Sequence, residues 1–294
     1  MTRRDSSFHT SNGTVGVGAA TFATIECARR TVKALLPARV RALLPPILRN
    51  APLVARAWPV FKRPLALAQH YLNRTLPPEK CVRLRNGGEL TLSGHELDMA
   101  VVFQVFCDEV YPVDRDTVVI DIGANIGLFS LYAAFHGARK VYAFEPNREA
   151  YCCMLKNIEK NNLQGRIVPS RLAVTSRSNE VVTIPKGASP QNRIAHESVR
   201  DDEHESVTTI SLNDIVRNEG ISRIDLLKMD CEGCEYDILG GTDASTFAKI
   251  GRIIIEYHDG KERQIEKDLR RHGFSLDREA AENDRMGMLW FGRA

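Results

Sequence analysis

The chain has 294 residues, 43% of them hydrophobic and 26% charged, with a formal net charge of +3. This composition is that of a globular protein, and it excludes a collagen-like, low-complexity or wholly disordered chain. The charge is unevenly placed: residues 1–75 hold 12 Lys and Arg against two acids, Asp5 and Glu26, about +10, which leaves about −7 for the rest. A basic N-terminal segment therefore precedes a mildly acidic body.

The seven cysteines are odd in number and irregularly spaced, which predicts free thiols in a reducing compartment rather than a disulfide framework. No stretch approaches the ~20 consecutive apolar residues of a membrane span. Residues 15–28 come nearest to a secretory signal, but they include Glu26 and begin far from the start. We expect a cytoplasmic protein; an Arg-rich, acid-poor start also fits an organelle transit peptide.

Residues 1–75 are predicted to form a partly disordered extension with short helices interrupted by prolines. In the segment 28–50, apolar and basic residues interleave at helical spacing. Such a segment forms either a helix with a solvated basic face or an interfacial helix on anionic lipid. The short apolar runs favour the first interpretation, and the second leaves peripheral membrane contact open.

Residues 76–116 are predicted to form a lead-in or cap for the domain that follows. The segment "CVRLRNGGELTL" is typical of a hairpin that turns at 86–88, and a short helix is expected within 96–111.

From residue 117 to 294, predicted strands and helices alternate, which indicates a doubly wound α/β sheet. The polar loop at 185–206 is long enough for a lid or a mobile segment. The predicted strands are 117–123, 140–146, 166–174, 180–184, 207–212, 223–230 and 252–258, with helices in 126–137, 147–162, 211–220, 233–241 and 261–273 and a closing hairpin from 274–277 and 286–292.

Four polar clusters follow predicted strands of this sheet. Ligands bind at the carboxyl ends of the strands in such folds, and right-handed crossovers bring those ends to one edge. We therefore expect one binding edge that carries "DIGANIG" (121–127), "FEPN" (144–147), "MDCEG" (229–233) and "EYHD" (256–259).

The turn "DIGANIG" contains Asp121, Gly123, Asn125 and Gly127. Its glycines allow a sharp turn and close backbone approach to a ligand, and the next helix offers free N–H groups. The third glycine of a dinucleotide fingerprint is missing, and Asp121 suits an ammonium group better than a pyrophosphate. Glu145, which ends the next strand 22 residues after Gly123, is placed to accept hydrogen bonds from a ribose.

Four segments in this order, "VVIDIGANIGLFSLYAA", "VYAFEPN", "SLNDI" and "IDLLKMDCEGCEYDILGG", resemble the FkbM family of class I S-adenosylmethionine-dependent methyltransferases. The resemblance covers roughly residues 81–275. It implies a Rossmann-like, seven-stranded methyltransferase sheet and methyl transfer to a hydroxyl of a sugar, glycolipid or natural product. A small-molecule or glycan acceptor follows from it, and no nucleic-acid partner is expected.

The resemblance also implies cofactor contacts at Asp121, Gly123, Asn125 and Gly127, with Glu145 on the ribose. Family members often have an acid near the adenine after the third strand. This chain has "RLAVTSRS" there, without an acid. The adenine contact is therefore expected from the backbone and apolar surface of Ala173 and Val174.

A hydroxyl acceptor needs a general base close to the reactive methyl group. Asp230, at the end of a predicted strand, is the first candidate, Glu232 the second and His258 the third, and Lys228 would orient a carboxylate or the substrate. Asp230, His258 and Glu256 would alternatively form a divalent-metal site, but no ligand signature requires one, and no metal is expected.

Three other functions are compatible with parts of the sequence. A nucleotide-dependent oxidoreductase would need the missing glycine. A thiol redox protein would use Cys231 and Cys234, although Glu232 and Glu235 would raise the pKa values of the thiols. A membrane-associated binding protein would have kept the fold and lost catalysis.

Overall fold

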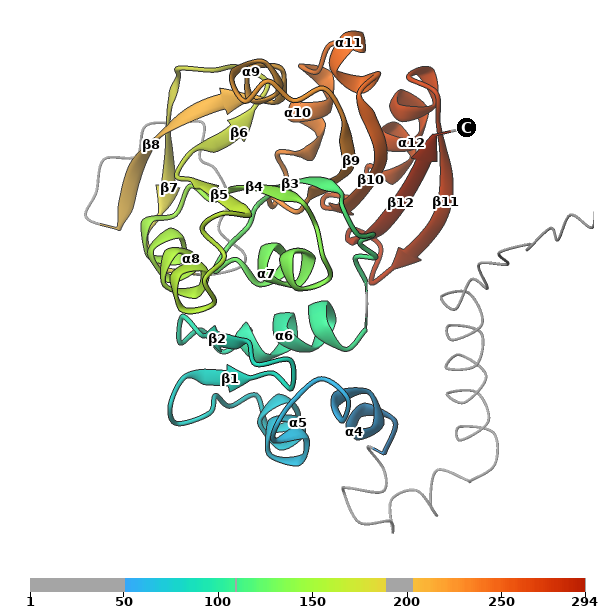
Figure 1. Ribbon diagram of the computed structural model, residues 1–294. Helices are drawn as coiled ribbons and strands as arrows, with labels where there is room; N and C mark the ends of the chain where they lie inside the picture. Colours follow the sequence, from blue (N-terminus) through green and yellow to red (C-terminus); the bar gives the residue numbers. More distant parts are fainter. Residues whose placement is uncertain (1–50, 109, 189–202, 294) are drawn as a thin grey trace, which may run out of the picture. The chain divides into compact units, whose positions relative to one another are not determined.

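The computed structural model describes residues 51–108, 110–188 and 203–293 (Figure 1). The chain divides into two compact units, residues 1–55 and 56–294. Helix α4 (Ala51–Ala57) crosses this boundary. The predictions for residues 1–50, and for most of the polar loop at 185–206, lie outside the described residues.

A seven-stranded mixed sheet forms the centre of the second unit, in the order β11-β12-β10-β9-β3-β4-β5. Strands β5, β4, β3, β9 and β10 are parallel, while β12 is antiparallel to both β10 and β11. The predicted doubly wound sheet and closing hairpin are confirmed. The strands are β3 (Val118–Ile122), β4 (Lys140–Phe144), β5 (Ile167–Ser170), β9 (Ile224–Met229), β10 (Ile250–Tyr257), β11 (Phe274–Ala281) and β12 (Gly287–Arg293).

Helices cover both faces of the sheet, as Figure 1 shows. On one face lie α6 (Asp98–Phe106), α7 (Leu128–Phe135) and α8 (Arg148–Lys160). On the other lie α9 (Leu212–Asn218), α10 (Glu235–Gly240), α11 (Ala244–Phe247) and α12 (Glu262–Arg271). Local chemistry sets two of the starts: the side chain of Asn147 accepts a hydrogen bond from the Ala150 N–H and begins α8, and Ser211 caps α9 in the same way.

Strand β3 lies at the centre of the sheet, and all five of its residues are buried. This explains its continuous apolar run, because a parallel strand covered on both faces has no solvent side. From β3 the chain continues to β4 and β5 on one side and later to β9 and β10 on the other. The topological switch point, where ligands bind in such sheets, therefore lies at the carboxyl ends of β3 and β9.

A separate three-stranded sheet consists of β6 (Ala173–Thr175), β8 (His204–Ser211) and β7 (Val181–Pro185). Ala173, Ile184 and Val207 form its small core. The single strand predicted at 166–174 is therefore two strands, of which β5 belongs to the main sheet and β6 pairs with β8. Periodicity did not separate them because both are short apolar segments.

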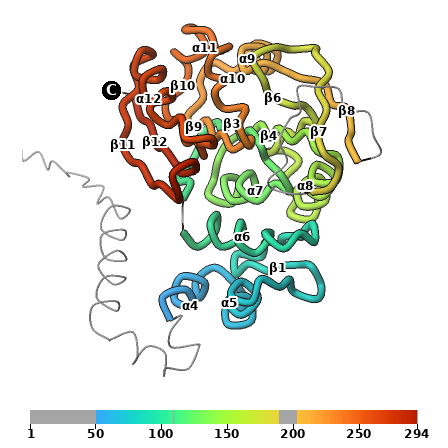
Figure 2. The backbone as a smooth tube through the Cα atoms, turned by 180° about the vertical axis from the view of Figure 1, so that it is seen from behind, coloured from blue at the N-terminus to red at the C-terminus, as the bar shows by residue number. Residues whose placement is uncertain are grey.

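The lead-in segment packs on the face that carries α7. Strands β1 (Cys81–Arg83) and β2 (Glu89–Thr91) form the predicted hairpin. The ring of Phe103 in α6 contacts those of Phe61 and Tyr71, the latter in α5 (Pro64–Asn73), at centroid distances of 5.3 and 4.6 Å. Figures 1 and 2 both place α6 between α7 and α5.

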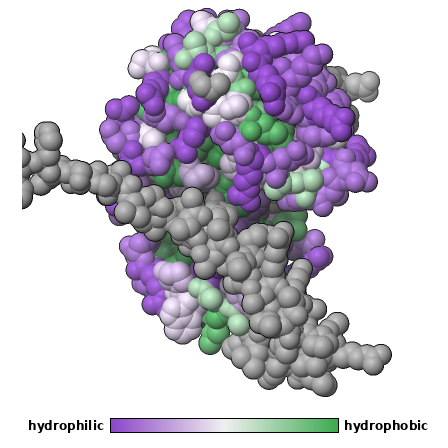
Figure 3. Space-filling model, turned by 90° about the vertical axis from the view of Figure 1, so that its right-hand side faces the viewer, coloured by the Kyte–Doolittle hydropathy of each residue, from purple (hydrophilic) through white to green (hydrophobic). Residues whose placement is uncertain are grey.

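The edge strand β11 exposes charged residues at 277–279, which discourages edge-to-edge pairing with another chain. Figure 3, which views the molecule from this side, shows a mainly hydrophilic surface. Among the described residues, none of the helices has the length and apolar character needed to cross a membrane.

Candidate functional site

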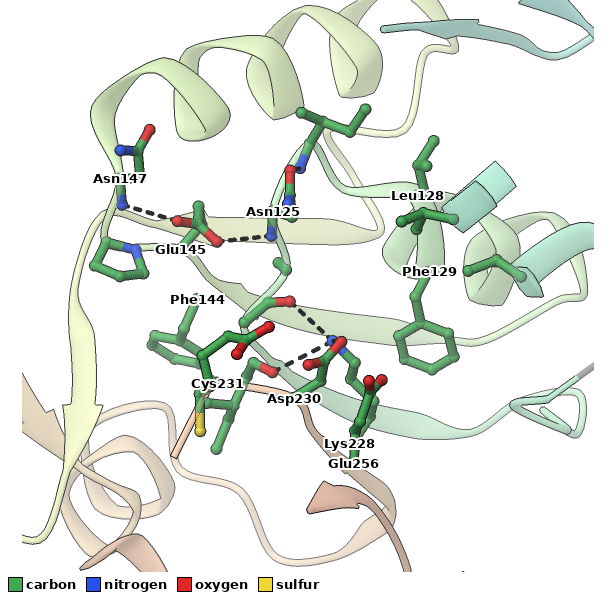
Figure 4. A pocket seen from close by; sticks show the side chains of 18 of the residues that line it. Asn125, Leu128, Phe129, Phe144, Glu145, Asn147, Lys228, Asp230, Cys231 and Glu256 are labelled. Atoms are coloured by element: carbon green, nitrogen blue, oxygen red, sulfur yellow. Dashed lines mark hydrogen bonds and ion pairs between the residues drawn. The ribbon is translucent and has the colours of Figure 1, made fainter. Parts of the chain in front are cut away.

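A cavity of about 340 Å³ lies at the switch point, and Figure 4 shows part of its lining. Its size falls in the range of small-molecule sites. Residues after β3, β4, β9 and within the end of β10 contribute to its walls, so the four predicted polar clusters meet in or beside it. Helix α6, the turn between β11 and β12, and residues in and beside β6 and β7 form further parts of the wall.

The turn after β3 requires its glycines. Gly123 has φ +76°, and a Cβ there would lie 1.7 Å from the backbone oxygen of Asp230. Gly127 has φ +82°, and a Cβ would lie 2.7 Å from Cγ of Met154 in α8. Gly123 and Asn125 line the cavity, whereas Gly127 does not and instead allows α7 to approach α8.

Glu145 connects the end of β4 to this turn. One carboxyl oxygen accepts a hydrogen bond from the Asn125 N–H at 2.7 Å, and the other accepts one from the Asn147 N–H at 2.8 Å. Burial raises the pKa of Glu145 to about 7, against the opposing effect of these two donors. The carboxyl group lies in the cavity wall (Figure 4), where sequence analysis placed a ribose contact.

An apolar wall adjoins Glu145. Ala173 and Val174 are 0% and 4% exposed, and they line the cavity together with Phe144, Leu172 and Ile184. No acidic residue of β6 lines this wall. These described side chains are hydrocarbon, which suits contact with a flat aromatic ring.

Lys228 is a buried residue of the cavity wall, and its partners are anionic. Its Nζ lies 3.1 Å from Oδ1 of Asp121 and 3.6 Å from Oδ2 of Asp230, and it donates a hydrogen bond to the carbonyl oxygen of Gly123 at 2.8 Å. Burial lowers the pKa of Lys228, but Asp121 and Asp230 outweigh burial, so the net pKa is raised and the amine stays charged.

Asp121 does not line the cavity, although sequence analysis placed it against the cofactor. It is wholly buried, and its second oxygen accepts a hydrogen bond from the Ser130 hydroxyl at 2.6 Å. Its partners are therefore α7 and Lys228 of β9.

A cluster of carboxyl groups surrounds His258 on the other side of the cavity. Nε2 of His258 lies 3.3 Å from Oε2 of Glu232, and Nδ1 lies 3.3 Å from Oε1 of Glu235. Burial lowers the pKa of His258, but the carboxyl groups of Glu235, Glu232 and Asp230 outweigh burial and raise the pKa to about 9. His258 itself is wholly buried and does not line the cavity.

Asp230, Glu232 and Glu256 do line the cavity. Burial raises the pKa of Asp230 despite the opposing charge of Lys228. Burial, followed by the charge of Asp230, raises the pKa of Glu256 to about 9. Carboxyl groups with raised pKa values in a cavity are the usual mark of proton-transfer or ligand-binding chemistry.

Cys231 and Cys234 are free thiols beside this cluster. Contact with Cys234, followed by burial, holds the pKa of Cys231 well above its usual value. A redox pair needs a thiolate, so this environment disfavours the thiol redox function.

Sequence reasoning missed part of the lining. Tyr111, Gln104 and other residues in and around α6, and Glu282 and Met286 from the turn between β11 and β12, face the cavity. None of them follows a predicted parallel strand, so strand-end reasoning could not find them.

A Rossmann-like sheet with a glycine turn and a strand-end glutamate at its switch point defines a class of α/β enzymes that bind a nucleoside-containing cofactor. Residues 121–276, more than half of the chain, match the model of the methyltransferase FkbM domain. The chain belongs to the FkbM methyltransferase family, and it is an S-adenosylmethionine-dependent methyltransferase.

Three relatives illustrate the similarity. AMB antimetabolite synthetase AmbE of Pseudomonas aeruginosa is 30% identical over 59% of this chain, which spans only 10% of that protein. The 31-O-demethyl-FK506 methyltransferase FkbM of Streptomyces tacrolimicus is 26% identical over 66% of this chain and 88% of its own. The hexuronic acid methyltransferase AglP of Haloferax volcanii is 26% identical over 50% of this chain and 58% of its own.

Proposed function

We propose that the protein transfers the methyl group of S-adenosylmethionine to a hydroxyl of a sugar, glycolipid or natural product. One observation carries the proposal: one cavity is lined both by Glu145, the carboxyl group expected to bind a ribose, and by a cluster of acids around Asp230. The names of two relatives support an oxygen acceptor, because one acts on a 31-O-demethyl compound and the other on a hexuronic acid.

The cofactor half of the cavity fits S-adenosylmethionine. Glu145 would accept hydrogen bonds from the ribose hydroxyls, and the wall that contains Ala173 and Val174 would pack on the adenine. The backbone at Gly123 and Asn125 would bind the amino-acid portion. Asp121 and Gly127 act indirectly in this proposal: Asp121 holds Lys228 under the turn, and Gly127 sets the start of α7.

The half of the cavity around Asp230 and Glu232 would bind the acceptor and remove its proton. When bound, the cofactor provides an electrophilic methyl carbon, and the protein has to orient the acceptor oxygen and remove its proton. Asp230 is the base in this proposal because it lines the cavity and burial raises its pKa. Glu232 is the alternative base. His258 lies behind the wall and orients these carboxyl groups, and Lys228 keeps Asp230 in place.

A labelled-methyl transfer assay against extracted glycans, glycolipids and small metabolites tests the proposal, with S-adenosylhomocysteine binding measured in parallel. Asp230→Asn, which keeps the shape of the side chain, should lower transfer by about 10²–10⁴-fold and leave S-adenosylhomocysteine binding nearly unchanged. Absence of cofactor binding by the wild-type chain, or transfer to nitrogen in place of oxygen, would contradict the proposal.

A further inference from the structure

We propose that Asp230, Glu256 and His258 bind one divalent metal ion, of the Mg²⁺ or Mn²⁺ type, beside the acceptor subsite. The binding itself is independent of the proposed function, whereas the role given to the ion below rests on it. No metal was expected from the sequence, because no ligand motif is present. The three residues come together only through the pairing of two strands.

The strands β9 and β10 place the three side chains together. They are parallel neighbours, with Met229 opposite Ile255, so Asp230 and Glu256 follow at the same level of the sheet. One potential ligand atom from each of Asp230, Glu256 and His258 lies within 4.8 Å of the others. An octahedral ion with ligands at ~2.1 Å separates its ligands by about 3–4 Å, so small side-chain adjustments complete the site.

His258 supplies a second, independent observation. The ring is wholly buried, and neither nitrogen makes a hydrogen bond to any residue that the structure describes. Glu235, which is also wholly buried, lies 3.3 Å from Nδ1 and is itself fixed by the N–H groups of Cys231 and Gly233. Nε2 lies 3.3 Å from Oε2 of Glu232, which also lines the cavity, so an ion bound at this nitrogen would have Glu232 as a neighbouring carboxylate. A carboxylate behind the other ring nitrogen is the usual setting of a metal-binding histidine.

Carboxyl groups outnumber cationic side chains in this half of the cavity. Asp230, Glu232, Glu256 and Glu282 line it, and among the lining residues that the structure describes Lys228 alone is a Lys or Arg. Lys228 is already paired with Asp121 and Asp230.

The oxygen-rich ligand set selects the type of ion. The two carboxylates suit Mg²⁺ or Mn²⁺, and of these two ions Mn²⁺ accepts the additional imidazole more readily.

An ion at this position would lower the pKa of a coordinated acceptor hydroxyl. In the transfer step the acceptor oxygen forms the new C–O bond while the C–S bond breaks. The bonding electron pair passes to sulfur and the hydroxyl proton to the oxygen of Asp230 that does not bind the ion. The metal would therefore activate the same acceptor that Asp230 deprotonates.

Titration of the full chain with Mn²⁺, followed by electron paramagnetic resonance, tests the site without an acceptor. We expect one saturable Mn²⁺ site in the wild type and in Glu282→Gln, the matched control that removes an acid from the same cavity outside the ligand set. Glu256→Gln and His258→Gln should each weaken binding by at least about tenfold. Mg²⁺ should displace the bound Mn²⁺.

Absence of a saturable site in the wild type, or an unchanged site in both Glu256→Gln and His258→Gln, would overturn the proposal. S-adenosylhomocysteine binding is measured on the same samples. Lost Mn²⁺ binding with normal S-adenosylhomocysteine binding tells against the metal site alone. If the wild type does not bind S-adenosylhomocysteine, the proposed function is contradicted.

Discussion

At the scale of single residues, Gly123 determines how closely β3 and β9 approach at their carboxyl ends. An alanine Cβ would lie 1.7 Å from the backbone oxygen of Asp230, and the positive φ of +76° adds strain. We expect Gly123→Ala to lower the free energy of unfolding by more than about 3 kcal/mol, because neither strand end can move without disturbing the sheet.

Gly220→Ala is the matched control for this prediction, since Gly220 has φ +61° but nothing within 4 Å of its added Cβ. It should cost only about 1 kcal/mol in urea unfolding, the effect of the backbone conformation alone. Equal costs at the two positions would show that the close approach of the strands is not what requires glycine at 123.

Glu145 gives cofactor binding a pH dependence. Its pKa is raised to about 7 by burial, and the ribose hydroxyls are expected to bind its ionised form. One pH unit below that pKa only about a tenth of the carboxyl groups is ionised, so the affinity for S-adenosylhomocysteine should be about tenfold lower than well above it. Calorimetric titration across this range measures the change, and Glu145→Gln should bind weakly without a step near that pKa.

The same group affects the stability of the ligand-free protein with the opposite sign. Its folded-state pKa of about 7 lies above the ordinary value of 4.5. The stabilisation from its bound proton is therefore complete below about pH 4.5 and lost as the pH rises through about 7. Cofactor affinity rises over the same pH interval, so ionisation of Glu145 lowers the free energy of unfolding and strengthens cofactor binding.

At the scale of secondary-structure elements, Lys228 connects β3 and β9 through a buried ion pair with Asp121. Lys228→Met leaves Asp121 buried without its counter-charge, and such losses cost about 3–5 kcal/mol. The double variant with Asp121→Asn should recover part of the lost free energy of unfolding, because no uncompensated charge remains at Asp121.

Chemical denaturation of the two variants measures this coupling, with Lys267→Met as a control on the exposed surface of α12. The control should change the free energy of unfolding by less than about 0.5 kcal/mol. A single Lys228→Met variant as stable as the wild type would contradict the role of Lys228 as a connection between the strands.

Local sequence patterns predicted the elements well where one short segment decides the structure. The apolar run at 118–122, the Asn147 cap and the glycines of the turn each act within a few residues, and each was found. The split of the predicted strand 166–174 into β5 and β6 depends on pairing with β8, more than 30 positions away. Periodicity within one segment contains no information about such a partner.

The candidate site follows the same division. Strand-end reasoning brought Glu145, Asp230 and Glu256 to one edge. It expected a cofactor contact from Asp121 but could not foresee that Lys228 of a neighbouring strand approaches Asp121 within 3.1 Å. Asn157 was missed altogether: its buried side chain joins α8 to Thr91 of β2 and to the Ile126 carbonyl oxygen. Bridges of this kind leave no pattern in the sequence.

At the scale of the whole molecule, the described residues that line the cavity lie between Leu97 and Met286, and residues 56–294 form a compact unit of their own. We expect a chain that begins at Ala51, and so keeps α4, to bind S-adenosylhomocysteine with an affinity within about twofold of the full chain. Its thermal unfolding midpoint should also stay close to that of the full chain. A large loss of affinity would show that residues 1–50 contribute to the site.

The same pair of chains tests the two interpretations of the basic N-terminal segment. Residues 1–50 hold eight Lys and Arg against two acids, and each basic side chain near an anionic bilayer contributes about 1 kcal/mol of attraction. If the segment is an interfacial helix, only the full chain sediments with vesicles that contain phosphatidylglycerol, and salt releases it. If it is a solvated extension, both chains stay in the supernatant, and the net charge of 8 − 2 = +6 on residues 1–50 has no role at a membrane surface.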